Sequence, residues 1–479
     1  MICLNCVSEP YLRKLISMEA PGSCGLCGEQ VVPAMPYSDL ADLVERAFEE
    51  HYRRTATEPN PMEYAAQKEG LFDWYQQGEP TAEVISDACG IHIEAAEAVR
   101  EILEVRHADL FASQCGQQCE FEAAAQYERK PVDTWQLHQD WAELERSLKT
   151  EARYFNDQAK TLLDEVFLDL ASATAHNDRA VIREAGPGSD LTAVFRARVF
   201  QAQDELERAL EAPDRELAAP PSRRATAGRM NAQGISVFYG ATEPKVAVSE
   251  VRPPVGSRVL LGRFEFVRSV RLLDIEALKS LVVEGSIFDP EYARRLKRAH
   301  FLEALAHRIT QPVMPDDQSS DYLVTQAMAD YLAARKDLQL DGIAYGSSQG
   351  DPGGFNVALF NRSGKTQRIE LPAGSQVEAS LYEQDEDGEH PNYLVFEKAA
   401  KVQPAVAPTE KQQASPPLLG FDVSTLTPLA DAADGDWRQP TLRLDLESLQ
   451  VLHVRAVSYE AEAFKVTRLK TVLADKHEF

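Results

Sequence analysis

The sequence lacks two features that would tie the chain to a membrane or to export. It has no run of roughly 18 or more apolar residues, the length that a helix needs to cross a bilayer, so a transmembrane helix is excluded. Its first residues show no basic stretch followed by an apolar one, so we expect no secretory signal. The sequence therefore predicts a cytoplasmic protein without a membrane partner.

Positive charge is also scarce. The chain carries 50 Lys and Arg against 76 Asp and Glu, which gives a net charge of −26 and a pI near 4.9. Because a protein that binds a duplex must neutralise phosphates with cations, this balance argues against nucleic acid as a partner. With 479 residues, the chain is long enough for two or three domains, each with its own core.

Common catalytic fingerprints are missing as well. The sequence contains no G-x-S-x-G, no H-E-x-x-H and no G-x-x-x-x-G-K-[ST]. The segment Gly350–Gly354 is rich in glycine, but no Lys follows it, so it is not a phosphate-binding P-loop. Any chemistry must therefore come from other polar residues.

Cysteines are few but unevenly placed. Four of the seven fall within the first 27 residues and read C-x2-C, seventeen residues, C-x2-C: Cys3, Cys6, Cys24 and Cys27. This spacing predicts a structural zinc site, since four thiolates close the coordination shell of one tetrahedral ion. A redox pair or unligated thiols are the alternative. We expect the remaining three to be ordinary free thiols: Cys89, Cys115 and Cys119.

The pattern divides the chain into three blocks. Residues 1–37 form the zinc-binding segment, or zinc knuckle. Residues 38–185 read as an all-α helical bundle, which ends at the helix-breaking run Gly186–Asp190. Thr134 is expected to cap one helix of this bundle. Two apolar stripes at helical spacing predict its core: Leu137, Trp141, Leu144 and Leu148, then Phe155, Ala159, Leu162, Leu163, Val166, Phe167 and Leu170.

Residues 186–479 change to short alternating strands mixed with helices, which predicts a mixed α+β domain. We expect Lys401–Pro417 to be an exposed Pro-rich loop and Glu383–Glu389 to be a solvated acidic turn. Strands are expected at 195–199, 235–239, 259–266, 270–274, 357–360, 452–458 and 463–468.

Two arginines stand out in the first of these strands. Arg196 and Arg198 lie on the same strand face, roughly 7 Å apart. Two guanidinium groups at this spacing suit a diphosphate, because each can bind phosphate oxygens with two hydrogen bonds. The alternative is a pair of solvated arginines on an exposed face.

A carboxylate on a helix is the next candidate. Thr242 is expected to cap a helix that has Pro244 in its first turn. Val246 and Ala247 then share a helix face with Glu250. A carboxylate on the sheet-facing side of a helix must be paired or functional, because burying it unpaired is costly. As the alternative, Glu250 is satisfied by a cation at the rim: Lys245 or Arg252.

Six short elements of this third block follow one another in a characteristic order. They are Phe195-Arg196, Gly228-Arg229-Met230-Asn231-x-x-Gly234, Val237-Phe238-Tyr239, Ala247-Val248-Ser249-Glu250-Val251-Arg252, Asp341-Gly342-Ile343-Ala344-Tyr345-Gly346-Ser347 and Asn356-Val357-Ala358-Leu359-Phe360. This order resembles the RES domain. The resemblance covers the chain from Leu191 onward, with insertions around Phe288–Tyr322 and Glu383–Asp436.

This family is named for its Arg, Glu and Ser, and its characterised members are bacterial toxins that degrade NAD⁺. The resemblance implies a fold related to ADP-ribosyltransferases. The zinc segment and helical block resemble the zinc-containing, HEPN-like domain that precedes some long RES proteins.

Carried over residue by residue, the resemblance implies a site for NAD⁺. Arg196 and Arg229 would hold the diphosphate and ribose side, and Tyr239 would pack at the nicotinamide end. Ser347 would donate a hydrogen bond to phosphate. Glu250 would lie beside the nicotinamide ribose, where a fixed carboxylate stabilises a developing oxocarbenium ion, with Arg229 and Tyr239 completing the catalytic set. Met230 stands where the family often has Trp. Ser348, the neighbour of Ser347, is the alternative donor.

The expected activity is NAD⁺ degradation by cleavage of the nicotinamide–ribose bond, as an NAD⁺ phosphorylase or NAD⁺ glycohydrolase in a toxin or defence effector. Inorganic phosphate or water would be the acceptor, and ADP-ribose transfer to a macromolecule stays open. We also expect an antitoxin or regulatory partner, a homo-oligomer, and restraint by the helical block in cis.

Two alternatives belong to other classes. The first is a HEPN-type RNA-cleaving enzyme, since Arg100-x6-His107 fits the motif of that family, although Arg294-x5-His300 fits it too. The second is an inactive RES-like sensor of NAD⁺ or ADP-ribose.

Overall fold

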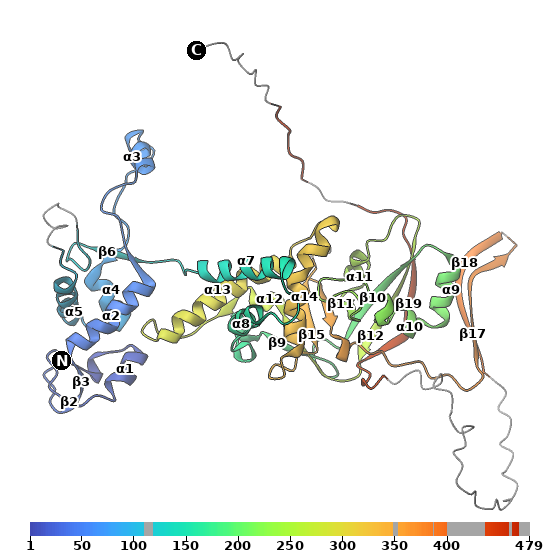
Figure 1. Ribbon diagram of the computed structural model, residues 1–479, viewed down its shortest axis with the longest axis horizontal. Coiled ribbons are helices and arrows are strands. Elements are labelled where there is room, and N and C mark those ends of the chain that lie inside the picture. The colour runs from blue at the N-terminus through green and yellow to red at the C-terminus, as the bar shows by residue number, and fades with distance from the viewer. Residues whose placement is uncertain (110–117, 348–352, 387, 400–435, 459–461, 469–479) are drawn as a thin grey trace, which may run out of the picture. The chain divides into compact units, whose positions relative to one another are not determined.

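The structure is a computed structural model, and it describes residues 1–109, 118–347, 353–386, 388–399, 436–458 and 462–468 (Figure 1). The chain forms two compact units, each built from three segments. Unit 1 contains Met1–Arg183, Thr226–Gln233 and Arg271–Tyr345, and unit 2 contains Glu184–Ala225, Gly234–Val270 and Gly346–Phe479. Both are mixed α/β. The domain boundaries drawn from the sequence remain predictions.

Short strands and helices alternate in the first part of unit 1. Two three-stranded sheets, β1-β3-β2 and β4-β6-β5, lie beside a helical core to which α2 contributes Leu40, Val44 and Phe48. The elements are β1 (Ile2–Cys3), η1 (Leu4–Cys6), α1 (Pro10–Ile16), β2 (Pro21–Gly22), β3 (Val32–Met35), α2 (Tyr37–His51), β4 (Tyr52–Arg54), α3 (Pro61–Lys68), β5 (Glu79–Pro80), α4 (Thr81–Cys89), α5 (Ile93–Arg106) and β6 (Gln126–Arg129). The block predicted as all helical therefore also contains strands.

Two predicted helices follow, α7 (Trp135–Thr150) and α8 (Asp157–Val166). Thr134 occupies the N-cap position of α7 but makes no capping hydrogen bond; Asp133 Oδ1 accepts from the Trp135 N–H at 2.9 Å instead. The predicted stripes are buried, with one exception: Phe155 is 102% exposed. It precedes the true N-cap, Asn156, and its φ of 58° turns it out of the helix pattern.

A long helix pair completes unit 1 where the sequence showed an insertion. α13 (Pro290–Thr310) and α14 (Gln318–Ala334) pack on α7 and α8. The Trp141 and Phe301 ring centroids are 5.6 Å apart, and those of Phe167 and Tyr331 are 6.1 Å apart. The remaining elements of this part are η2 (Leu170–Ser172), β7 (Thr174–Ala175), η3 (His176–Asp178), β8 (Arg179–Ala180), β9 (Ile182–Ala185, whose last two residues are assigned to unit 2), β13 (Val270–Asp274), α12 (Ile275–Leu278), β14 (Leu281–Val282), η5 (Pro315–Asp317) and β15 (Gly342–Gly346).

Pairing in this part of unit 1 is of two kinds. β13, predicted at its observed bounds, pairs in parallel with β15. The small sheet β14-β7-β8 is antiparallel. No described helix of the chain is long and apolar enough to span a membrane.

An antiparallel run of five strands, in the order β19-β12-β10-β11-β16, is the framework of unit 2. Its apolar positions pack under the short helix α11, where Val246 and Ala247 contact Ala197, Ala241 and Val259. The elements are β10 (Ala193–Phe200), α9 (Gln203–Glu211), α10 (Pro213–Glu216), η4 (Ser222–Arg224), β11 (Phe238–Ala241), α11 (Pro244–Glu250), β12 (Arg258–Phe266), β16 (Phe355–Leu359), η6 (Asn361–Ser363), β17 (Gln376–Asp385), β18 (Gly388–Lys398) and β19 (Leu442–His453).

The start of α11 differs from the sequence-based prediction. Its N-cap residue is Glu243, and Pro244 occupies the first turn as expected. Thr242, predicted as the cap, instead ties β11 to β16: its Oγ1 accepts from the Phe355 N–H at 3.1 Å. Gly354 sits close under the helix, because a Cβ there would lie 2.5 Å from Val246 Cγ2.

Predictions for the last part of the chain have different outcomes. The predicted acidic turn is exposed at Glu383, Gln384, Glu386 and Glu389, with a turn at Glu386, but its flanks belong to the paired strands β17 and β18, where Glu383 pairs with His390. The last strand among the described residues is β19. The strands predicted at 452–458 and 463–468 are therefore wrong, since only residues 452–453 belong to a strand and the rest of these two ranges to none. The Pro-rich segment 401–417 lies outside the described residues.

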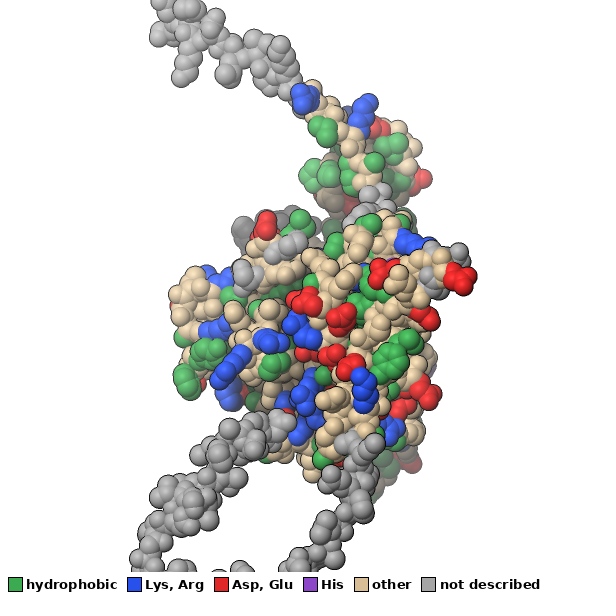
Figure 2. Space-filling model, turned by 90° about the vertical axis from the view of Figure 1, so that its right-hand side faces the viewer, with side chains coloured by type: hydrophobic (Ala, Val, Ile, Leu, Met, Phe, Trp, Pro, Cys, Tyr) green, Lys and Arg blue, Asp and Glu red, His purple; other side chains and the backbone are tan. Residues whose placement is uncertain are grey.

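Charged side chains of both signs occur across the face shown in Figure 2. On this face the basic side chains gather toward the left and lower part of the view, and the acidic ones lie mainly in its centre and on its right.

Candidate active site

The four N-terminal cysteines converge on one point of unit 1. Cys3 ends β1, Cys6 ends η1, and Cys24 and Cys27 lie in the turn before β3. Their sulfur atoms all lie within 4.8 Å of one another, with separations of 3.6 Å (Cys3–Cys27), 3.7 Å (Cys3–Cys6) and 3.8 Å (Cys6–Cys24). Four sulfurs at about 2.3 Å from one tetrahedral zinc ion would be about 3.8 Å apart, so the cluster fits a closed metal site.

Backbone groups shape this cluster. Gly28, at φ 77°, closes the second turn by donating to the Cys24 carbonyl at 3.1 Å. Burial raises the pKa of Cys24, but hydrogen bonds from the backbone N–H groups of Cys27, Leu26 and Cys3 outweigh it and lower this pKa to about 6. Burial raises the pKa of Cys3 and Cys6. One thiol is therefore prepared to ionise, as a zinc ligand must.

The other cysteines take no part in the cluster. Cys89 is buried in the core of unit 1, and burial raises the pKa of its thiol. Cys119 is also buried. Cys115 lies outside the described residues.

Glu250 of unit 2 is held at the C-terminal end of α11 by two neutral donors. The Ser347 hydroxyl donates to Glu250 Oε1 at 3.1 Å, and Asn356 Nδ2 donates to the same oxygen at 2.6 Å. A carboxylate at a helix C-terminus is unfavourably placed in the field of the helix dipole. These contacts rather than helix stability therefore account for its position. The Glu250 residue is exposed, unlike its neighbours on the same helix face.

Asn356 is the contact that sequence reasoning missed. It is a 3% exposed residue in β16 and pairs across strands with Ala241. It opens the apolar run that ends at Phe360, and a polar residue at the head of such a run is the signal that could have drawn attention to it. Its distance of 106 residues from Glu250 concealed the pairing.

Arg196 lies close to Tyr239 in the same unit. Arg196 Nη1 donates to the Tyr239 carbonyl at 3.1 Å, and its guanidinium carbon lies 4.8 Å from the Phe238 ring centroid. Burial, and then the charge of Arg198, lower the pKa of Arg196 to about 10. No described carboxylate forms an ion pair with Arg196, so its guanidinium is a desolvated cation without a described counter-ion.

Arg198, the second member of the predicted pair, is engaged differently. Its guanidinium forms an ion pair with Glu216. Of the two arginines, only Arg196 is left for an anionic ligand, and the half-buried Tyr239 lies beside it on β11.

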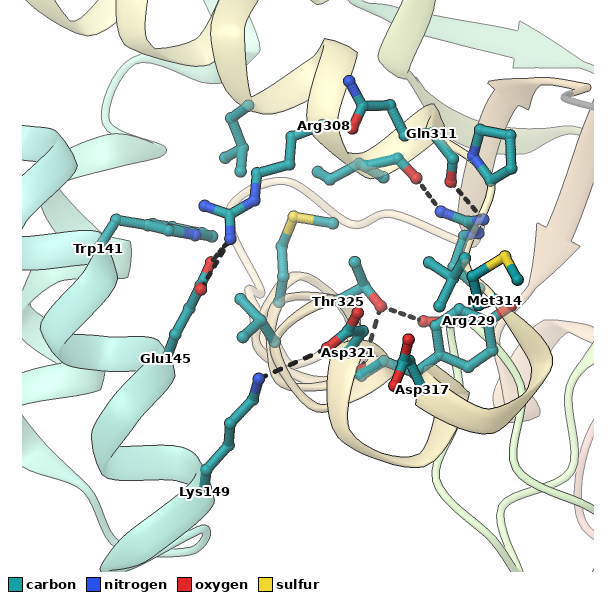
Figure 3. Close-up of a pocket in the computed structure, with 17 residues that line it drawn as sticks. Trp141, Glu145, Lys149, Arg229, Arg308, Gln311, Met314, Asp317, Asp321 and Thr325 are labelled. Carbon is teal, nitrogen blue, oxygen red and sulfur yellow. Dashed lines mark hydrogen bonds and ion pairs between the residues drawn. The ribbon is translucent and has the colours of Figure 1, made fainter. Parts of the chain in front are cut away.

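Arg229 belongs to unit 1, where it forms one wall of a pocket of about 290 Å³ (Figure 3). Its guanidinium donates to the Ile309 carbonyl, and to the Gln311 carbonyl at 2.9 Å. The Tyr322 ring lies 5.4 Å away, and Thr325 Oγ1 donates to the Arg229 carbonyl at 2.7 Å. The junction between α13 and α14 therefore holds this arginine at both its backbone and its side chain.

Other charges in this pocket are paired. Arg308 contacts Glu145 at 2.7 Å, and Lys149 contacts Asp321 at 3.5 Å, which links α7 to the ends of α13 and α14 (Figure 3). Met230, which replaces the family's Trp, is 1% exposed and packs inside unit 1. Ser348 lies outside the described residues.

The HEPN-type pair is fully engaged with other residues. Arg100 is buried and donates to Glu97 and Glu104, each at 2.6 Å, and to the Phe121 carbonyl at 3.0 Å. The ring of His107 contacts Glu45 at 2.6 Å and Glu120 at 3.2 Å. Two carboxylates around each residue suit structural pairing and oppose the approach of an RNA phosphate.

Unit 2 therefore contains a desolvated arginine on β10, Arg196, and a carboxylate at the end of α11, Glu250, that is held by two neutral donors. Residues 198–381 match the model of the RES domain, so the chain contains a RES domain, a family associated with enzymes that act on NAD⁺. The match includes Arg229, Tyr239, Glu250 and Ser347 and begins two residues after Arg196. No curated protein and no solved structure matches the chain.

Proposed function

We propose that this chain is an NAD⁺-degrading enzyme that cleaves the nicotinamide–ribose bond by phosphorolysis or hydrolysis, as a toxin or defence effector. One observation carries the proposal: within a RES domain, Glu250 is fixed through a single carboxylate oxygen by Ser347 and Asn356. The ADP-ribosyltransferase-like fold that the resemblance implies belongs to this proposal.

The chemistry requires a fixed negative charge. When the bond between the ribose C1″ and the nicotinamide nitrogen breaks, its electron pair goes to the nitrogen and neutral nicotinamide leaves. The ribose becomes an oxocarbenium ion, which a held carboxylate stabilises without reorganisation. Phosphate or water then forms the new bond to C1″, and water gives up a proton to solvent. Glu250 is the residue that we assign to the cation.

Arg196 is assigned to the diphosphate of NAD⁺. Its charge is desolvated and has no described carboxylate partner, and a guanidinium binds phosphate oxygens with charge-assisted hydrogen bonds. Tyr239 beside it is assigned to the nicotinamide end. Arg229 is assigned to the same substrate by resemblance, and its guanidinium must exchange the Ile309 and Gln311 carbonyls for phosphate to do so.

The cysteine cluster is assigned a structural Zn²⁺. The four sulfurs leave no coordination position open for water, so we derive no catalytic step from it. An antitoxin or regulatory partner, a homo-oligomer and restraint by the helical part of the chain remain part of the proposal.

The test is consumption of NAD⁺ by the full chain, with and without phosphate, beside Glu250→Ala. Nicotinamide release that the variant lacks supports the proposal. A requirement for phosphate identifies a phosphorylase, and indifference to it a hydrolase. Label from NAD⁺ on protein would identify transfer to a macromolecule. NAD⁺ that binds and stays intact identifies a sensor and overturns the enzyme.

A further inference from the structure

We infer that Asn356 is a positioning residue for the reaction, which fixes the Glu250 carboxylate so that one oxygen, Oε2, is left for the substrate. This inference rests on the proposed function. Asn356 Nδ2 makes the shorter of the two contacts to Glu250 Oε1, 2.6 Å against 3.1 Å from Ser347. Both donors reach the same oxygen, and no described residue is a hydrogen-bond partner of Oε2.

The backbone around Asn356 is fixed against β11 and the residue that follows it. It pairs with Ala241 in the β11–β16 ladder. The preceding residue, Phe355, exchanges two hydrogen bonds with Thr242: its N–H donates to Oγ1 at 3.1 Å, and its carbonyl accepts from the Thr242 N–H at 3.0 Å. The direction of the Asn356 amide is therefore set by the sheet and not by the helix that carries Glu250.

Burial gives this contact its strength. At 3% exposure, the Asn356 amide has lost its water and must find an acceptor inside the protein, since leaving a buried donor unpaired is costly. Glu250 is exposed at the end of α11 and would otherwise sample several side-chain rotamers. The buried Asn356 amide therefore restricts the exposed Glu250 side chain to one orientation.

The donors are neutral, and this matters for the chemistry. A Lys or Arg in the place of Asn356 would hold Glu250 equally well but would cancel its charge. An amide and a hydroxyl fix the carboxylate and leave it a full negative charge. This arrangement suits a group that must stabilise a cation on the substrate, and it is not needed for a carboxylate that only supports the fold.

The experiment compares full-length wild type with Asn356→Ala, Asn356→Asp and Ser347→Ala. We expect Asn356→Ala to lower kcat about 10- to 100-fold with KM for NAD⁺ within about 2-fold, since misplacing a reacting group by about 1 Å costs that much. Asn356→Asp, nearly the same shape, should lose more, because it sets a second carboxylate against Glu250. The double variant with Ser347→Ala should lose less than the product of the single losses, since both donors hold one oxygen.

Asn361→Ala is the matched control. Its amide donates at 3.2 Å to the Ser236 carbonyl in the same unit, so the variant removes an asparagine contact without touching Glu250. Thermal unfolding of every variant distinguishes a loss of folding from a loss of Glu250 positioning. If Asn356→Ala does not fold, Asn356→Asp takes its place in the comparison with wild type.

A second measurement does not depend on turnover. The side-chain amide of Asn356, followed by NMR, should shift when Glu250→Gln replaces the charged acceptor. An amide that ignores this change, or folded Asn356→Ala with full kcat, overturns the inference alone. A KM that rises at unchanged kcat also overturns it, because it makes Asn356 a substrate contact. A wild-type chain that leaves NAD⁺ intact overturns the proposed function.

Discussion

The guanidinium of Arg196 rests against the ring of Phe238, 4.8 Å from its centroid, while Nη1 donates to the next carbonyl along the chain, that of Tyr239. The aromatic face and the carbonyl oxygen both favour the cation, but neither supplies a full negative charge. Burial accordingly lowers the pKa of this arginine to about 10, with the charge of Arg198 acting in the same direction. An incoming phosphate would find a cation that needs little further desolvation.

Replacing Arg196 should weaken substrate binding. We expect Arg196→Lys to raise KM for NAD⁺ by about 10- to 100-fold, since a charge-assisted hydrogen bond contributes about 1.5–3 kcal/mol and an ammonium cannot match the guanidinium geometry. Steady-state kinetics measure it. Arg208→Gln, on the exposed face of α9, is the control and should change KM less than about 2-fold. An unchanged KM in Arg196→Lys would remove the diphosphate role.

Neutralising Glu250 should abolish turnover while the fold persists. Glu250→Gln keeps the shape and can still accept from Ser347 and Asn356 through its amide oxygen, but it loses the charge. We expect kcat to fall by about 10²–10³, the loss seen when one preorganised electrostatic group is removed. Nicotinamide release is the readout, and Glu205→Gln on α9 is the matched control. Wild-type kcat in Glu250→Gln would contradict the assigned role.

The cysteine cluster should hold one zinc ion per chain. Metal analysis of the purified protein should find it, and Cys24→Ser should lose it, since three sulfurs and a poor ligand bind zinc weakly. Cys89→Ser, outside the cluster, is the control and should keep the metal. Stripping zinc with a chelator should lower the midpoint of thermal unfolding. A chain purified without metal and equally stable would exclude a structural site.

Trp141 should be a main support of unit 1. It is 3% exposed and contacts Phe301, so Trp141→Ala should lower the free energy of unfolding by about 3–5 kcal/mol. Trp135, in the first turn of the same helix, is 64% exposed. Trp135→Ala should therefore change the free energy of unfolding by less than about 0.5 kcal/mol. Denaturant titration of both variants measures the two changes in the free energy of unfolding. Equal changes would contradict the packing of α7 on α13.

Features with a local cause were predictable from the sequence. The cluster of four cysteines was predictable because each pair has two intervening residues, so a single turn of the chain brings its two sulfurs together. The buried face of α7 was also predictable, because the helical spacing of its apolar residues can be recognised from residues close together in the sequence. The same reasoning failed at Phe155, where the capping side chain of Asn156 starts the helix one residue too late for Phe155 to join it.

Contacts between distant segments were out of reach. Glu250 is expected from its helix to need a partner, and Lys245 or Arg252 were the nearest candidates, but the partners that the structure places on Oε1 come from Ser347 and Asn356. Arg196 and Arg198, predicted to act together, also have different partners, because Arg198 forms an ion pair with Glu216 on α10. Such pairings depend on which strands become neighbours, and spacing along the chain does not encode that.

The division of each unit into three chain segments has a consequence for biosynthesis. Trp141 and Phe167 leave the ribosome long before their partners on α13 and α14, Phe301 and Tyr331, are translated. At about 5–20 residues per second, this leaves the apolar faces of α7 and α8 uncovered for on the order of ten seconds. Nascent chains in this interval are candidates for chaperone binding, and a message truncated before residue 290 would yield a product that lacks both helices that bury these faces.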